Sequence, residues 1–262
     1  MNVLNKTPRI IAVSNQKGGV GKTTTAVNLA TALAAVKKKV LVLDMDPQGN
    51  ATVSFGIDRR NAPKNMYQVL MGDAKISSTI VWTKIPNLSV VVSSKDLAGA
   101  DFELSHADDP QLFLKRSLEN EPLNYDYIFI DCPPAVGMLT VNALVAADSV
   151  IVPVQCEYLA LEGVADLMKT IERVKHNFNP PLEIQGIVLT MFDGRTGLSE
   201  VVAQDVRNYF GDKVYNSIIP RNVRVSEAPS HGKPILLYDF KSKGAQAYIA
   251  LAKELLKQEK KK

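Results

Sequence analysis

The sequence predicts an α/β fold, a single domain with a mostly parallel, twisted sheet flanked by helices on both faces. Short apolar, β-branched segments recur along the chain and alternate with longer segments of helical periodicity. Such alternation produces parallel strands joined by crossover helices. The 262 residues, 46% of them hydrophobic, suffice for one large core, and no Pro-, Ser- or Gly-rich tract marks a linker. We therefore expect one domain over residues 1–262.

The expected strands are runs dominated by Val, Ile and Leu, as is typical of strands buried on both faces. In chain order they lie at 10–13, 40–43, 88–92, 127–130, 150–154, 184–190 and 214–219. The segments between them have amphipathic or apolar helical patterns, at 23–36, 109–120, 139–147, 159–176, 198–210 and 243–257. Residues 51–87 have weak periodicity, with one short helix expected at 66–71. A short flexible lead, residues 1–8, and a basic tail, residues 258–262, flank the domain.

Composition excludes several classes of protein. The net charge of +4, from 31 Lys and Arg against 27 Asp and Glu, permits an anionic partner without requiring one. Cys132 and Cys156 are far apart in sequence, so neither a disulfide framework nor a zinc site is indicated. No apolar run approaches the roughly 18 residues of a membrane span, and we expect a cytoplasmic protein.

A glycine-rich segment between the first strand and the first helix is the most informative motif. Residues 14–25 read S-N-Q-K-G-G-V-G-K-T-T-T, and strand, glycine loop and helix together are the context of a phosphate-binding P-loop. Glycines let the backbone turn successive N–H groups onto a phosphate, and the helix N-terminus adds attraction. The expected phosphate contacts are Lys17, Gly18, Gly19, Val20, Gly21, Lys22, Thr23 and Thr24. The alternative, a plain glycine turn, is disfavoured by the G-K-T-T sequence.

Two of these residues have distinct expected roles. Lys22 supplies a positive charge to the β- and γ-phosphates, and the Thr23 hydroxyl ligates Mg²⁺. The loop departs from the pattern G-x-x-x-x-G-K-[ST], because Gln16 stands where a glycine is required, and a second lysine, Lys17, follows it.

K-G-G-V-G-K-T-T resembles the deviant Walker A signature of the ParA/MinD ATPase family. The resemblance implies a P-loop NTPase that uses ATP and Mg²⁺. It also implies that Lys17 reaches the ATP of the other subunit in a face-to-face homodimer. A second cation would offset phosphate charge left by Lys22 and Mg²⁺. Spacing alone leaves open that Lys17 points to solvent.

Carboxylates follow two further strands of the predicted sheet. Asp44 and Asp46 come directly after residues 40–43, on the same side of an extended chain, and Asp131 follows residues 127–130 as in a Walker B segment. Asp131 is expected to hold Mg²⁺. The resemblance assigns the attacking water to Asp46 and places Asp44 close to Mg²⁺. Taken singly, each motif could be a strand-end turn, since Asp before Pro is common there.

Further motifs sort the chain within the family. D-P-Q-G-N at 46–50, D-C-P-P at 131–134 and I-I-P-R-N-V-R-V-S-E-A-P-S-H-G-K-P at 218–234 resemble the chromosomal ParA (Soj) form. The resemblance implies adenine contacts at Pro220 and Asn222. It also implies DNA binding without sequence preference by arginines matching Arg195 and Arg224, to which Arg221 and Lys233 could add.

The leading interpretation is a ParA-type ATPase of chromosome or plasmid segregation. The resemblance implies an ATP-dependent homodimer on the nucleoid, with slow hydrolysis stimulated by a centromere-binding partner of the ParB/Spo0J type. One alternative is a MinD-like positioning ATPase on a membrane, using the apolar face of the last helix; we expect that face to pack on the core instead, and no membrane partner. Another is a redox protein like the nitrogenase iron protein, with two cysteines per chain bridging an iron–sulfur cluster.

Overall fold

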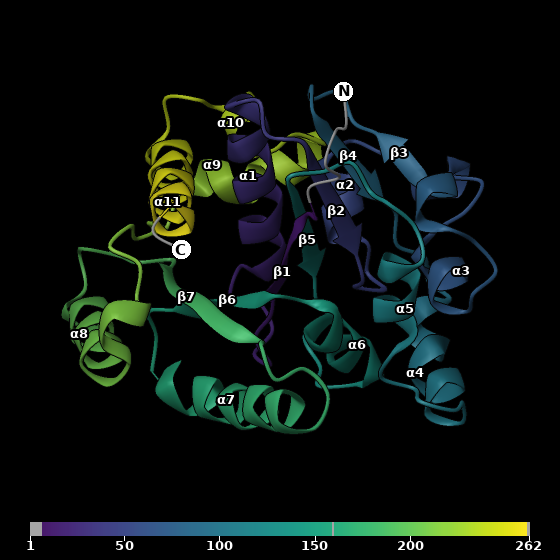
Figure 1. The fold of residues 1–262 in the computed structure, drawn as a ribbon. Helices are drawn as coiled ribbons and strands as arrows, with labels where there is room; N and C mark the ends of the chain where they lie inside the picture. Colours follow the sequence, from purple (N-terminus) through teal and green to yellow (C-terminus); the bar gives the residue numbers. More distant parts are fainter. Residues whose placement is uncertain (1–6, 159, 261–262) are drawn as a thin grey trace.

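A seven-stranded sheet of order β3-β4-β2-β5-β1-β6-β7 forms the centre of the computed structural model, which describes residues 7–158 and 160–260 (Figure 1). Every neighbouring pair is parallel except β3 and β4. The α/β prediction is therefore confirmed. The strands are β1 (Arg9–Val13), β2 (Val40–Asp44), β3 (Ile80–Trp82), β4 (Leu88–Val91), β5 (Tyr127–Asp131), β6 (Ser149–Gln155) and β7 (Glu183–Thr190).

Helices cover both faces of this sheet. They are α1 (Lys22–Ala35), α2 (Asn50–Ser54), α3 (Met66–Leu70), α4 (Leu97–Ser105), α5 (Phe113–Glu119), α6 (Met138–Ala146), α7 (Ala160–Asn177), α8 (Gly197–Phe210), α9 (Val223–Glu227), α10 (Ile235–Tyr238) and α11 (Lys243–Glu259). Figure 1 shows α6 and α7 on one side of the sheet and α1 and α11 on the other.

Strand β2 shows why the apolar runs lack a polar face. Leu41 and Leu43 are buried in the core beneath α3 to α8, whereas Val40 and Val42 are buried in the core beneath α1 and α11. Since successive side chains of a strand point to opposite faces, a strand with helices on both sides must be apolar throughout.

The expected strand 214–219 is wrong. This segment runs beside β7, with an isolated bridge between Ile187 and Val214 and hydrogen bonds from Tyr215 N to Ile187 O and from Ile219 N to Leu189 O, both at 2.9 Å. Between these two bonds the ladder is interrupted, because Asn216 N and Ser217 N donate to the Glu254 carboxylate of α11 at 2.8 and 3.0 Å. The tertiary contact with α11 replaces a regular ladder.

Other boundaries differ from the sequence prediction. The expected helix 109–120 begins only at Phe113, after Asp109 takes a positive φ of 52°. Helix α4 and the antiparallel strand β3 were not expected, whereas α3 matches the expected helix at 66–71.

The chain ends are described in part. Helix α11 continues to Glu259, two residues into the expected tail. Residues 1–6 of the expected lead, residue 159 at the expected start of a helix and residues 261–262 of the tail lie outside the described residues. None of the helices within 7–158 and 160–260 is long and apolar enough to cross a membrane.

Candidate functional site

The strand order brings the sequence-predicted motifs together at one edge of the sheet. Strand β5 lies between β2 and β1, with Asp131 in register with Asp44 on one side and Val13 on the other. The glycine loop leaves β1 immediately after Val13. Because the carboxyl ends of parallel strands share one edge, the loop and both aspartates converge where ligands bind in open α/β sheets.

The loop has the backbone geometry that its glycines permit. Gly19 and Gly21 have φ angles of 74° and 88°, in the left-handed region that other residues rarely adopt. Nothing lies within 4 Å of a Cβ built on Gly19, so its conformation, not crowding, favours glycine there. Gly21 caps α1 without a side-chain hydrogen bond, which leaves N–H groups of the first turn for a ligand.

The two lysines of the loop are linked through the backbone. The Lys22 ammonium donates to the Lys17 carbonyl at 3.0 Å. Lys22 is buried, and burial lowers its pKa, while the negative charge of Asp131 opposes that shift. The nearby carboxylates therefore favour the protonated form of Lys22, which burial disfavours.

Asp44 and Asp131 are fully buried carboxylates with unsatisfied oxygens. Asp44 Oδ2 accepts from Thr52 N at 2.8 Å and from Thr52 Oγ1 at 2.6 Å, but Asp44 Oδ1 has no hydrogen-bond partner in the described chain. Neither carboxylate oxygen of Asp131 has a partner of standard hydrogen-bond geometry there. Unpaired buried carboxylate oxygens are costly, which indicates that a cation belongs beside them.

Burial raises the pKa of both groups, and the charge of a neighbouring carboxylate adds to each shift, Asp46 for Asp44 and Asp44 for Asp131. Desolvation, opposed by the Thr52 hydrogen bonds, raises the pKa of Asp44 to about 6. Desolvation and then the charge of Asp44 raise the pKa of Asp131 well above its usual range, although the Thr23 hydroxyl and Lys22 oppose that shift.

The donor set fits Mg²⁺ bound together with phosphate. Two carboxylates and the Thr23 hydroxyl supply the oxygen ligands that Mg²⁺ prefers, with the remaining positions left for water and phosphate. No cluster of three or more His, Cys, Asp or Glu side chains able to hold a metal occurs within 7–158 and 160–260.

Asp46 lies in a turn that fixes its orientation. Its Oδ1 accepts from Gln48 N at 2.9 Å, and its carbonyl accepts from Gly49 N at 2.9 Å and from Ser93 Oγ at 2.5 Å. The side chain is nearly buried beside Asp44, whose pKa it helps to raise. Its carboxylate is thus held at the same edge of the sheet as the metal candidates.

Pro220 and Asn222, the predicted base contacts, line a cavity of about 250 Å³ that also borders Gly21 and Thr24 of the loop. Asn222 additionally caps α9, its Oδ1 accepting from Arg224 N at 2.9 Å. The cavity thus adjoins the loop as a nucleoside pocket must.

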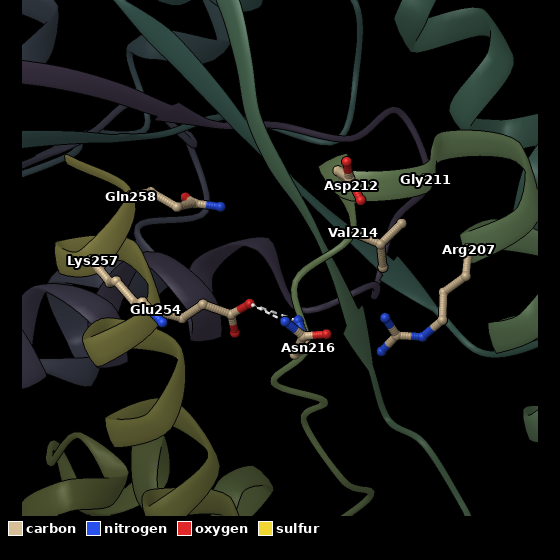
Figure 2. A pocket seen from close by; sticks show the side chains of 8 residues that line it. All are labelled: Arg207, Gly211, Asp212, Val214, Asn216, Glu254, Lys257 and Gln258. Atoms are coloured by element: carbon tan, nitrogen blue, oxygen red, sulfur yellow. Dashed lines mark hydrogen bonds between the residues drawn. The ribbon is translucent and has the colours of Figure 1, made fainter. Parts of the chain in front are cut away.

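A second pocket, of about 390 Å³, lies apart from this site (Figure 2). It is bordered by Arg207 of α8, by Gly211 and Asp212 after α8, and by Glu254 of α11, whose carboxylate accepts hydrogen bonds from Asn216 (Figure 2). None of the predicted site residues lines it.

The predicted DNA contacts lie on exposed segments. The bridge between Phe192 and Pro220 and the bond from Arg221 N to Phe192 O at 2.9 Å join the loop of Arg195 to the segment of Arg224. Arg195 and Arg224 are exposed, as are Arg221 and Lys233.

Both leading arginines are paired with carboxylates. Arg195 Nη2 lies 2.7 Å from Asp193 Oδ2, and Arg224 lies 3.1 Å from Glu227 and 3.7 Å from Asp239. The sequence did not predict these pairs.

Sequence reasoning also missed the polar residues that hold the site in shape. Asn15 and Thr190 bond the glycine loop, Thr52 bonds Asp44, and Ser93 bonds Asp46. Asn15 is the second residue after β1, and Thr190 ends β7. A polar residue at the carboxyl end of a buried strand was the available signal.

Comparison with known proteins places these features in one family. A family model described as an AAA domain matches residues 8–184. The chain is 55% identical over 254 residues to the chromosome partitioning protein ParA of Caulobacter vibrioides, covering 96% of this chain and 95% of that protein. It is 53% identical over 247 residues to the sporulation initiation inhibitor protein Soj of Bacillus subtilis, covering 94% of this chain and 98% of that protein.

A solved structure supports the architecture. Cobyrinic acid a,c-diamide synthase from Mycobacterium smegmatis, with a bound ATP analogue and magnesium, has a TM-score of 0.85 and 39% identity, covering 97% of this chain and 96% of that chain. Since both this fold and the ParA and Soj matches extend over nearly the whole sequence, the chain belongs to the ParA/Soj family of chromosome-partitioning ATPases.

Proposed function

We propose that this protein binds ATP with Mg²⁺, hydrolyses it slowly and uses the ATP-bound homodimer to bind DNA without sequence preference during chromosome or plasmid segregation. The observation that supports it best is the convergence of the glycine loop with two buried carboxylates that have unpaired oxygens. Membership of the ParA/Soj family supports the segregation role.

In this proposal the loop binds the triphosphate and the carboxylates hold the metal. N–H groups of residues 18–24 surround the phosphates, and the Lys22 ammonium moves from the Lys17 carbonyl to a phosphate oxygen. Mg²⁺ supplies charge stabilisation of the phosphates and would be held by Thr23, Asp131 and Asp44, directly or through water. Adenine would occupy the cavity beside Pro220 and Asn222.

Asp46 would orient the attacking water. Phosphoryl transfer needs a water in line with the leaving group. The turn around Asp46 holds its carboxylate in one orientation, as such a role requires. Slow hydrolysis without a partner would keep the protein ATP-bound and on DNA until a partner of the ParB/Spo0J type stimulates hydrolysis.

Dimerisation would make Lys17 and the arginines effective. Lys17 of each subunit would reach the other subunit's ATP. Two copies of Arg195 and Arg224, with Arg221 and Lys233 beside them, would double the phosphate contacts of one molecule. The proposed location is on the nucleoid.

Two features disfavour the alternative functions. Tyr248, Leu251 and Leu255 of α11 are buried against the core, so the apolar face needed for a membrane is occupied. Cys132 and Cys156 are buried in the core of the chain, whereas a cluster that bridges two subunits needs cysteines at the subunit surface.

The test is binding of purified protein to random-sequence duplex DNA with ATP and with ADP across a salt series. Salt-sensitive binding with ATP alone is the expected result. Anionic liposomes serve as the competing surface. Recruitment to liposomes in place of DNA would favour the membrane-positioning alternative, and no binding to either would contradict the segregation role.

A further inference from the structure

The end of β1 shows how the glycine loop leaves the sheet. Ser14 N donates to Ile151 O of β6 at 3.1 Å. In a parallel ladder the next bond would join the backbone N–H of Gln16 to the carbonyl of Pro153. Here the Asn15 side-chain amide takes that place, since Nδ2 donates to Pro153 O at 2.7 Å. A side chain thus completes the ladder while the backbone turns away.

The same side chain fixes the first residue of the phosphate motif. Asn15 Oδ1 accepts from Lys17 N at 3.0 Å, closing an Asx turn. Asn15 is only 3% exposed, so neither bond competes with bulk water. Its amide therefore ties the backbone of Lys17 directly to β6.

Lys17 is held from its other side by a bond that nucleotide would break. The carbonyl of Lys17 accepts from the Lys22 ammonium at 3.0 Å. When Lys22 turns to a phosphate, this bond breaks, and Asn15 remains as the side chain that holds Lys17 in the described chain.

The far end of the loop has a separate tether. Thr190 Oγ1 of β7 donates to the carbonyl of Val20 at 2.8 Å. Removing the Asn15 side chain would therefore release the Lys17 end of the loop and leave the end that precedes Lys22 and Thr23 in place.

We propose that Asn15 is a positioning residue that fixes Lys17 for its contact with the nucleotide of a second subunit. The inference rests on the proposed function, specifically on the role of Lys17 in the dimer. It predicts that Asn15 contributes little to ATP affinity and much to ATP-dependent dimerisation.

The experiment compares Asn15→Ala, Lys17→Ala and the double variant, with Gln16→Ala as the neighbouring control. Within residues 7–158 and 160–260, the Gln16 side chain makes one long hydrogen bond, from Nε2 to Thr170 Oγ1 at 3.4 Å. ATP affinity is measured with a fluorescent ATP analogue, and dimerisation by analytical ultracentrifugation with a non-hydrolysable analogue and Mg²⁺.

Asn15→Ala should leave the ATP dissociation constant within about threefold and weaken dimerisation at least about tenfold. The double variant should dimerise no worse than Lys17→Ala, because residues acting through one contact are not additive. Asn15→Ser keeps a hydroxyl that can accept from Lys17 N but loses the bond to Pro153 O, so it should restore dimerisation only in part.

Four results would overturn the inference in distinguishable ways. Normal dimerisation of Asn15→Ala beside defective Lys17→Ala would refute the role of Asn15 and leave the proposed function intact. Normal dimerisation of Lys17→Ala would refute both the role of Lys17 in the dimer and the role of Asn15 that depends on it. Parallel loss of ATP binding and dimerisation in Asn15→Ala, or additivity with Lys17→Ala, would show that Asn15 supports the whole loop instead.

Discussion

Asp46 is the residue whose removal should separate nucleotide binding from hydrolysis. Asp46→Ala should bind ATP and dimerise, because the loop and metal candidates remain, but its turnover should fall at least about 100-fold. The turn loses its bond to Gln48 N, at a cost of about 1 kcal/mol. Steady-state ATPase assays and ultracentrifugation test this, with the exposed Asp96→Ala as the control. A monomeric Asp46→Ala protein in ATP would contradict the assignment.

Asp44 gives the free protein a stability that depends on pH. Its pKa rises from the ordinary value of 3.8 to about 6 on folding, so between these values the folded state holds a proton that the unfolded state has lost. The free energy of unfolding contributed by this group therefore falls as pH rises from about 4 to about 6, then levels off. Asp44→Asn should remove this dependence.

Urea denaturation of both proteins at pH 5 and pH 7, without nucleotide or metal, measures the effect. The free energy of unfolding of Asp44→Asn, relative to that of the unchanged protein, should be higher at pH 7 than at pH 5. A difference independent of pH would show that Asp44 keeps its ordinary acidity.

Single residues also mark the limit of sequence-based prediction. Lys22, Asp44 and Asp131 could be located because each belongs to a motif beside a strand. The contacts of Asn15 and Thr52 could not be predicted, because their partners, Pro153 and Asp44, become neighbours only through the sheet order and the turn into α2. The local sequence does not determine which strand lies next to β1.

Among the elements, the contact between β7 and the segment after α8 makes a glycine necessary. A Cβ on Gly186 would overlap the buried ring of Tyr215, which lies against β7. Gly186→Ala should therefore destabilise the protein by about 1–3 kcal/mol through overpacking.

Gly197→Ala is the matched control for that variant. Gly197 begins α8 and has no heavy atom within 4 Å of a built Cβ. Alanine there should stabilise slightly, because it favours the helix. In urea denaturation, the free energy of unfolding of Gly197→Ala should equal or exceed that of the unchanged protein, and that of Gly186→Ala should be lower. Equal stability of all three would show that Tyr215 moves freely.

The elements that were predicted correctly are those whose pattern follows from burial. Strands β1, β2, β5 and β6 are apolar because helices cover both faces. The segment at 214–219 donates from Tyr215 N and Ile219 N to β7, but Asn216 N and Ser217 N between them donate to Glu254, which interrupts the ladder. The interruption could not be predicted from local sequence, because Glu254 lies on α11, 38 residues after Asn216.

Over the whole molecule, DNA binding should depend on charge from both subunits. Arg195→Ala with Arg224→Ala should keep ATP-dependent dimers while lowering the slope of log affinity against log salt, by about 0.9 for each DNA phosphate that the variant no longer neutralises. Arg116→Ala removes a comparably exposed, carboxylate-paired arginine on α5 and serves as the control. DNA titrations across a salt series measure the slopes. An unchanged slope would remove these arginines from the proposed surface.

The irregular segment beside β7 protects that edge of the sheet from pairing with another molecule. A long unpaired strand at a sheet edge invites the edge of another molecule and leads to fibres. Here residues 214–220 shield β7, and at the opposite edge β3 spans only Ile80–Trp82. If many copies bind side by side along DNA as proposed, they would meet through helices and loops and not by pairing of one sheet edge with another, so their contacts would stay reversible.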